Sequence, residues 1–286
     1  MIKRGATPLS KDRFSTRNPS NQTKPFKDIK NLQQSKPSLS RNASNSKLIV
    51  PMLTEPTKHN PESADRRLPS KKQITDEMRK VVVEWMLEVS HRSTMKRETV
   101  FMAVRLFDCG LAGMKEVGIT NVQLLATTAM FMSAKYEEIY PESLNKFLDY
   151  TLNSYMKHEI LVMEEKILTL MGFRLTFETR FIHAGMIMEK ELSYGPNAKK
   201  LKSMVVFLLE LSLLAQWEDY SENELGEAGV FLASKVLKYP PPAVSDRVME
   251  IAFQLMGVWR ENEGGVIAYL FDCEKESYVG GLKVIY

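Results

Sequence analysis

Three charged residues in the stretch SAKYEEIYPE, residues 133–142, are the first candidates for chemistry in this sequence. Lys135, Glu137 and Glu138 follow a tightly apolar run, LLATTAMFM, and precede a proline. Adjacent carboxylates beside a lysine are typical of general acid–base catalysis, but also of a solvated helix end or of a charged edge that binds another protein. Neighbouring residues of a helix project about 100° apart, so Glu137 and Glu138 are not expected to converge on one reacting atom.

The other chemically active residues of the chain favour no enzyme class. There is no convincing nucleophile–base pair and no phosphate-binding loop. The two cysteines, Cys109 and Cys273, are too few for a disulfide framework or a four-thiolate zinc site. The four histidines have no metal-ligand spacing, and we expect each to be a surface or satisfied core residue: His59, His91, His158 and His183. We therefore expect no metal and no cofactor.

Composition places the chain among soluble proteins. It has 286 residues, of which 44% are hydrophobic and 26% charged. The longest apolar stretch, residues 204–217, is too short for a membrane span and carries Glu210 in its middle. The first residues lack the apolar core of a secretory signal, so we expect an intracellular, reduced protein.

Charge divides the chain into a basic tail and an acidic body. Residues 1–74 hold 16 Lys+Arg against 5 Asp+Glu, whereas residues 75–286 hold 23 against 30. The tail is rich in Ser, Asn and Pro and poor in large apolar residues, so we predict that residues 1–72 are disordered. Its charge favours solubility, and the cluster RRLPSKK, residues 66–72, is a candidate for nuclear targeting or nucleic-acid contact.

From Thr75 onward the pattern is helical. Helix starts are expected at Thr75, at a Thr-x-x-Gln capping box formed by Thr120 and Gln123, and at a Ser-x-x-Glu box formed by Ser221 and Glu224. No segment alternates with a period of two, so no strand is predicted. Two Ala-rich apolar stretches, residues 124–143 and 226–245, resemble each other and suit the central helices of two bundles. The sequence thus predicts an all-α body of about ten helices.

The helix expected over residues 76–89 has more apolar surface than a surface helix needs. Its apolar residues form two adjacent stripes, and only a narrow arc with Lys80, Glu84 and Glu88 is polar. Such a helix is either nearly central or exposes one stripe as a docking groove. Arg79 falls within an apolar stripe, where a guanidinium needs a carboxylate, and Asp108 on the next helix is the expected partner.

Three motifs in this order and spacing resemble the cyclin box, with the greatest similarity to mitotic A/B-type cyclins. They are MRKVVVEWMLEV (residues 78–89), SAKYEEIYPES (133–143) and VMEEKILTLMGFRL (162–175). A looser similarity continues through residues 205–217 towards the C-terminus. The resemblance implies two tandem five-helix cyclin boxes after the basic tail, at residues 73–175 and 176–286.

The resemblance also implies a function. Cyclins are not enzymes. They bind and activate a cyclin-dependent Ser/Thr kinase, and they recruit substrates or inhibitors with an Arg-x-Leu motif through a hydrophobic patch. We therefore expect a regulator of mitotic cell-cycle progression in nucleus and cytoplasm, with no membrane partner and no direct contact with nucleic acid.

The characteristic residues of the cyclin box are present at matching positions. Lys135 and Glu164 match the residues that reach the kinase C helix, Arg79 and Asp108 match the internal ion pair, and Leu124 matches a core leucine. The expected docking patch consists of Met78, Val81, Val82, Trp85, Glu88 and Gln123.

Three departures and one alternative remain. The basic tail contains no Arg-x-x-Leu and no Lys-Glu-Asn, the degradation signals of the family, so destruction by that route is not expected. Cys109-Gly110 follows Asp108 where the family usually has arginine, and prolines 56, 61 and 69 prevent a long helix ahead of the first box. The alternative function is a two-repeat core, similar to a transcription-initiation factor, that binds promoter DNA and a TATA-binding partner. That function calls for a zinc ribbon and a basic repeat surface, and the acidic body offers little for binding phosphates.

Overall fold

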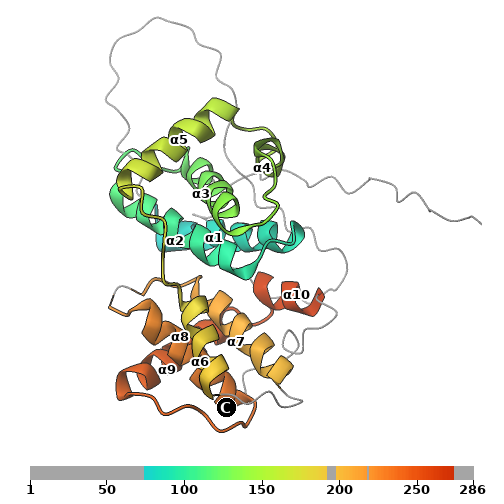
Figure 1. Ribbon diagram of the computed structural model, residues 1–286, viewed down its shortest axis with the longest axis vertical. Helices are drawn as coiled ribbons and strands as arrows, with labels where there is room; N and C mark the ends of the chain where they lie inside the picture. The colour runs from blue at the N-terminus through green and yellow to red at the C-terminus, as the bar shows by residue number, and fades with distance from the viewer. Residues whose placement is uncertain (1–73, 192–197, 218, 274–286) are drawn as a thin grey trace, which may run out of the picture. The chain divides into compact units, whose positions relative to one another are not determined.

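The computed structural model describes residues 74–191, 198–217 and 219–273. These residues form helices and connections, without a strand, so the all-α prediction is confirmed for them (Figure 1). The predicted disorder of residues 1–72, the RRLPSKK cluster and the region ahead of the first box lie outside the described residues. No helix in the described part of the chain is long and apolar enough to cross a membrane.

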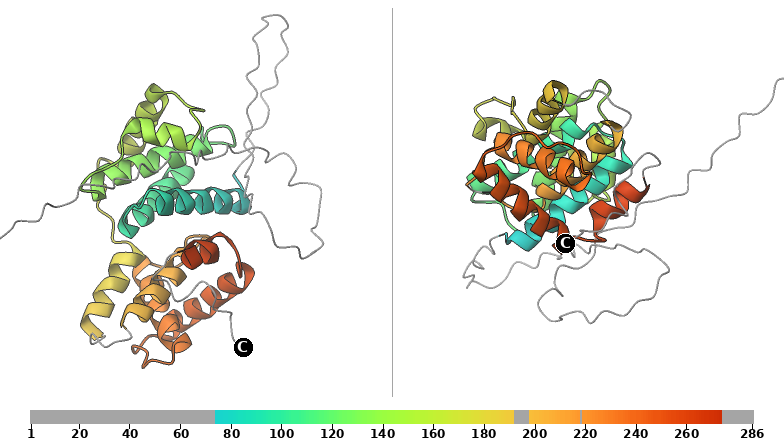
Figure 2. Two further views of the ribbon diagram at one scale, coloured as in Figure 1. Left: turned by 90° about the vertical axis from the view of Figure 1, so that its right-hand side faces the viewer. Right: turned by 90° about the horizontal axis from the view of Figure 1, so that it is seen from below.

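The first five helices pack around α3. They are α1 (Asp76–Arg92), α2 (Arg97–Gly113), α3 (Val122–Glu137), α4 (Leu144–Tyr150) and α5 (Lys157–Leu170). Every residue of α3 from Val122 to Ala134 is buried, and α3 contacts all four of its neighbours (Figure 2). The Ala-rich sequence explains this central position, because small side chains allow close approach on several sides.

The next five helices pack around α8 and α7. They are α6 (Arg180–Glu191), α7 (Ala198–Ser212), α8 (Glu222–Val236), α9 (Asp246–Glu261) and α10 (Val266–Cys273). A Cβ atom at Gly226 would lie 2.8 Å from the carbonyl oxygen of Arg180, so glycine allows α8 to approach α6 closely. The two groups of five helices agree with two tandem boxes, whose boundaries stay predictions.

Two of the three predicted helix starts are present. Thr75 Oγ1 accepts a hydrogen bond from the Met78 N–H, and Ser221 and Glu224 form the reciprocal capping box. The third prediction is wrong, because Thr120 lies in a turn and α3 begins at Val122. The Asn121 side chain accepts a hydrogen bond from the Gly118 N–H at 2.8 Å, which stabilises this turn ahead of the helix.

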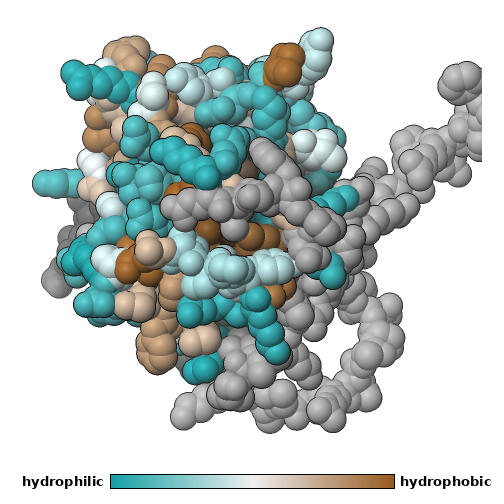
Figure 3. Space-filling model, turned by 60° about the horizontal axis from the view of Figure 1, so that its bottom comes forward, coloured by the Kyte–Doolittle hydropathy of each residue, from teal (hydrophilic) through white to brown (hydrophobic). Residues whose placement is uncertain are grey.

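Hydrophobic residues on the face shown in Figure 3 lie in small areas separated by hydrophilic ones. This is the ordinary surface of a helical protein, in which scattered apolar side chains carry no special meaning. A functional surface therefore has to be identified from particular residues.

Candidate functional site

Lys135 and Glu164 lie next to each other on the surface. Lys135 is in the last turn of α3, and its ammonium group forms an ion pair with the carboxylate of Glu164 on α5. The Lys135 Nζ atom also lies 4.3 Å from the centroid of the Phe131 ring, which favours a cation. The side chain of Lys135 is 42% exposed and that of Glu164 15% exposed, so the structure brings the two expected residues together at one accessible point.

Large apolar side chains close to this ion pair in the sequence are exposed. Tyr136, Ile139 and Tyr140 lie within five residues after Lys135, and their exposed fractions are 51%, 76% and 92%. Leu161, which is half exposed, lies one turn before Glu164 on α5. Apolar residues that are exposed together beside charged ones mark a protein-interaction surface. We call Lys135, Glu164, Tyr136, Ile139, Tyr140, Leu161 and Phe173 the α3–α5 surface.

Phe173 belongs to this surface through the connection between α5 and α6. It is 73% exposed and has a positive φ of 60°, a conformation that is uncommon for a bulky residue. The same connection is held at the end of α3, where the hydroxyl groups of Tyr136 and Thr176 lie 3.1 Å apart. The end of α3, the outer face of α5 and residues 171–179 therefore meet in one region.

Glu138 has a structural role. Its carboxylate accepts hydrogen bonds from the Lys96 backbone N–H, at 2.8 Å, and from the Thr99 hydroxyl, so it caps the N-terminus of α2. The Lys96 side chain in turn donates to the backbone carbonyl of Glu137. Burial, followed by the negative charge of Glu98, raises the pKa of Glu137. Because Glu138 is engaged with α2, the pair is not an acid–base dyad open to a substrate.

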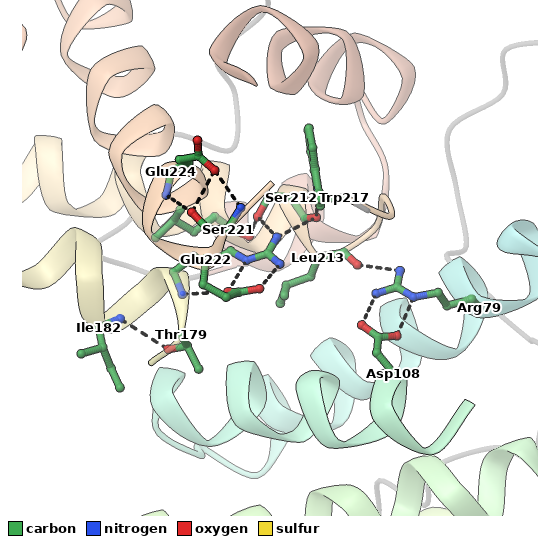
Figure 4. A network of polar contacts seen from close by, with 12 residues as sticks. Arg79, Asp108, Thr179, Ile182, Ser212, Leu213, Trp217, Ser221, Glu222 and Glu224 are labelled. Carbon is green, nitrogen blue, oxygen red and sulfur yellow. Dashed lines mark hydrogen bonds and ion pairs between the residues drawn. The ribbon is translucent and has the colours of Figure 1, made fainter. Parts of the chain in front are cut away.

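The ion pair expected between Arg79 and Asp108 is present. Arg79 is 4% exposed, and its Nε and Nη2 atoms donate to the two Asp108 oxygens at 2.7 and 2.8 Å. Its Nη1 atom donates to the backbone carbonyl of Leu213 at 2.9 Å, which the sequence did not predict (Figure 4). Arg79 thus joins α1 and α2 to the C-terminal end of α7.

A second buried arginine, missed from the sequence, repeats this arrangement. Arg180, at the start of α6, pairs with Glu222 through both Nε and Nη2 and donates to the backbone carbonyl and hydroxyl of Ser212 (Figure 4). Burial raises the pKa of Glu222, but the hydrogen bonds and charge of Arg180 outweigh this effect, so the pKa of Glu222 lies below its ordinary value. The sequence contained a signal for this ion pair, because Arg180 is the first residue of a helix with apolar residues, and Arg79 lies within such a helix.

Half of the residues of the expected docking patch are buried. Val82, Trp85 and Gln123 are 5%, 7% and 4% exposed, whereas Met78, Val81 and Glu88 are of intermediate exposure. Glu88 forms an ion pair with Arg92 one turn further along α1. The patch is therefore accessible along one edge, and its docking role stays a prediction. Leu124 is buried, as expected.

The remaining candidates have structural surroundings. His91 lies 3.2 Å from the buried carboxylate of Glu210, and His183 lies 3.7 Å from Glu227. His158 is exposed, and His59 lies outside the described residues. No cluster of three or more potential ligands in the described ranges could hold a metal ion. Gly110 allows close packing of α2 on α3, since a Cβ there would lie 2.6 Å from Leu125.

Comparisons with known proteins show the fold and the family that part of the chain resembles. The X-ray structure of a viral cyclin from herpesvirus saimiri superposes with a TM-score of 0.55 at 10% identity, over 72% of this chain and 90% of that one. The fold is therefore a cyclin fold. The family model described as "Cyclin, N-terminal domain" matches residues 49–176, so this part of the chain is similar to the N-terminal domain of cyclins.

Curated relatives place the chain near the A and B types. The G2/mitotic-specific cyclin-A of Drosophila melanogaster is 32% identical over 182 residues, which are 63% of this chain and 36% of that protein. The G2/mitotic-specific cyclin-B of Arbacia punctulata is 32% identical over 166 residues, 58% of this chain and 39% of that protein. This chain thus spans less than half of the length of these relatives.

Proposed function

We propose that this protein is a non-catalytic regulatory subunit that binds and activates a cyclin-dependent Ser/Thr kinase during mitotic progression. The observation that carries the proposal is the α3–α5 surface, in which an accessible ion pair joins the end of α3 to α5 and exposed aromatic and aliphatic side chains occur on the same segments. The names of the A- and B-type relatives, which include the words G2/mitotic-specific, support the mitotic role.

The α3–α5 surface has the chemistry of a helix-binding site. Tyr140, Ile139 and Phe173 offer apolar area that a partner would remove from water, which is the main source of affinity at such interfaces. Lys135 and Glu164 offer one charge of each sign, and they can exchange their exposed ion pair for contacts with a partner helix at little cost. Charges so placed fix the orientation of the partner more than they add affinity.

Binding at this surface would activate a kinase by selecting one of its conformations. The active state requires a Lys–Glu ion pair that includes the kinase C helix, together with a correctly placed magnesium-binding aspartate. A subunit that binds the active position of the C helix more tightly than the inactive position shifts the population towards the active state. The regulatory chain needs no catalytic group for this effect.

A charge exchange between Lys135 and Glu164 tests the proposal. Each single reversal, Lys135→Glu or Glu164→Lys, is expected to lower affinity for a co-purified cyclin-dependent kinase by at least tenfold, about 1.4 kcal/mol. The double exchange restores the ion pair within this chain but presents inverted charges to the kinase. It is therefore expected to bind as weakly as the single variants, measured by surface plasmon resonance and by phosphorylation of a Ser-Pro peptide.

The matched control is another exposed ion pair that involves α5. Lys166 and Glu116 lie 3.2 Å apart and are 46% and 48% exposed, so their exchange disturbs a similar pair outside the α3–α5 surface. The control exchange is expected to leave affinity and activation unchanged. Recovery of full binding by the Lys135–Glu164 double exchange would show that the pair acts only within this chain, and the kinase-binding assignment would then be wrong.

We further infer that the accessible edge of the docking patch recruits Arg-x-Leu peptides. Met78 and Val81 offer apolar contacts for the leucine, and Glu88 offers a carboxylate for the arginine in exchange for Arg92. Glu88→Ala is expected to weaken binding of a fluorescent Arg-x-Leu peptide about tenfold, about 1.4 kcal/mol, with no effect on a short substrate that lacks the motif. Lys80→Ala on the same helix is the control, and equal binding by both variants would contradict the assignment.

A further inference from the structure

A cavity lies between α1 and α2 on one side and the segment that joins α7 to α8 on the other. Its volume is about 930 Å³, at the upper end of the range for ligand sites in proteins. Its lining mixes charged groups with apolar ones, including Leu111, Val117 and Trp217. The cavity is separate from the α3–α5 surface and from the docking patch, neither of which contributes a residue to it.

Three arginines line this cavity, and two of them are paired with carboxylates. Arg79 donates to Asp108 and to the Leu213 carbonyl, and Arg180 donates to Glu222 and to Ser212. The positive charge of each guanidinium is therefore balanced within the chain. The carboxylates of Asp108 and Glu222 accept hydrogen bonds from these arginines. Each arginine–carboxylate pair therefore adds no net charge to the lining of the cavity.

Arg105 is different. It is exposed on α2, one turn before Asp108 and Cys109, and it makes no hydrogen bond or ion pair within the described ranges of the chain. Its positive charge nevertheless acts on groups that line the cavity. Burial raises the pKa of Cys109 and of Glu222, and the charge of Arg105 lowers both by a smaller amount. A planar guanidinium without a partner, beside an aromatic and aliphatic lining, is suited to a carboxylate attached to an apolar group.

We propose that this cavity binds a short segment of a partner protein that carries an aspartate or glutamate next to an apolar side chain. The carboxylate pairs with Arg105, and the apolar side chain contacts Leu111, Val117 and Trp217. A phosphorylated residue fits less well, because a dianion needs more than one free cation and the other two arginines are engaged. A nucleic-acid backbone carries many phosphates, whereas Arg105 alone among the cations of the described lining has a charge that no ion pair balances.

The probe for this site is a random heptapeptide library displayed on phage and selected against the full chain. Peptides enriched on the wild type are expected to contain an acidic residue at a constant spacing from an apolar one, and Arg105→Glu is expected to abolish their enrichment. Arg174→Glu is the matched control, because Arg174 is also exposed but lies between α5 and α6, outside the cavity. It should enrich the same peptides as the wild type.

An enriched peptide, synthesised with a fluorophore, then allows a charge exchange. Fluorescence anisotropy is expected to show a tenfold or greater loss of affinity for Arg105→Ala and for the peptide with Gln or Asn in place of its acid. A peptide with Lys at that position should bind Arg105→Glu better than the wild type does. Arg105 is exposed and unpaired among the described residues, so these substitutions are not expected to unfold the chain.

Cys109 reports where the peptide binds. It lines the cavity and is half-buried, and in a Cys273→Ser background it is the single thiol of the chain. Bound peptide should slow its alkylation by a maleimide at least several-fold. The proposal is overturned if the enriched peptides lack an acidic residue, if they bind Arg105→Glu as well as the wild type, or if they leave the alkylation rate unchanged.

Discussion

Arg79→Ala is expected to lower the free energy of unfolding by about 3 kcal/mol, the low end of the range for breaking a buried ion pair. The substitution leaves Asp108 without its bidentate partner and the Leu213 carbonyl without its donor. It also removes a link between α1 and the end of α7. Asp108 is 33% exposed, so water compensates part of the loss. Urea unfolding of the wild type and the variant measures the difference.

Two further variants separate the effect of the positive charge of Arg79 from the effects of its buried position and its planar geometry. Arg92→Ala removes an exposed partner of Glu88 on the same helix and should cost less than about 1 kcal/mol. Arg79→Lys keeps the charge but cannot form the planar contacts with Asp108 and Leu213 together, so its stability should lie between those of the wild type and Arg79→Ala. If Arg79→Ala costs no more than Arg92→Ala, then the ion pair is not what holds these helices together.

The second large effect is expected at the α3–α5 surface. Ile139→Asp and Phe173→Asp should each lower the affinity for the kinase about a hundredfold, about 2.7 kcal/mol, because each places a charge among apolar groups that binding removes from water. Both side chains are about three-quarters exposed in the free chain. The free energy of unfolding should therefore change by less than about 0.5 kcal/mol, which urea titration checks.

Phe253→Asp is the matched control for these two variants. Phe253 is 68% exposed, a similar fraction, but it lies on α9 in the other group of five helices. Its replacement is expected to leave kinase affinity and activation unchanged. A loss of affinity at Phe253 equal to that at Ile139 would mean that exposed apolar residues bind the kinase without specificity, and the α3–α5 surface would lose its special role.

The two alternative functions receive no support from the described residues. The acid–base hypothesis for Glu137 and Glu138 required carboxylates open to a substrate, whereas Glu138 caps α2. A DNA-binding core would need a basic surface, and residues 75–286 carry more acidic than basic side chains. The similarity of residues 49–176 to the N-terminal domain of cyclins, together with the α3–α5 surface, favours the regulatory proposal.

Local sequence patterns were enough to predict the helical class and much of its detail. The caps at Thr75 and Ser221 and the central position of the Ala-rich α3 depend on residues within one or two helical turns. The Arg79–Asp108 pair was also predictable, because a guanidinium in an apolar stripe needs a partner and the next helix offered a carboxylate. The Thr120 capping box was wrong, because Asn121 takes the N-cap position and its side chain accepts a hydrogen bond from the Gly118 N–H instead of capping α3.

The tertiary structure alone decided which distant groups meet. The Leu213 carbonyl is 134 residues from Arg79, and Glu222 is 42 residues from Arg180. Neither distance leaves a periodic signal in the sequence, because such contacts depend on how the helices pack. The same packing buries Trp85, turns Glu138 towards α2 and leaves Arg105 without a partner among the described residues. Helix formation is a local property, whereas a binding site is made where helices from distant parts of the chain come together.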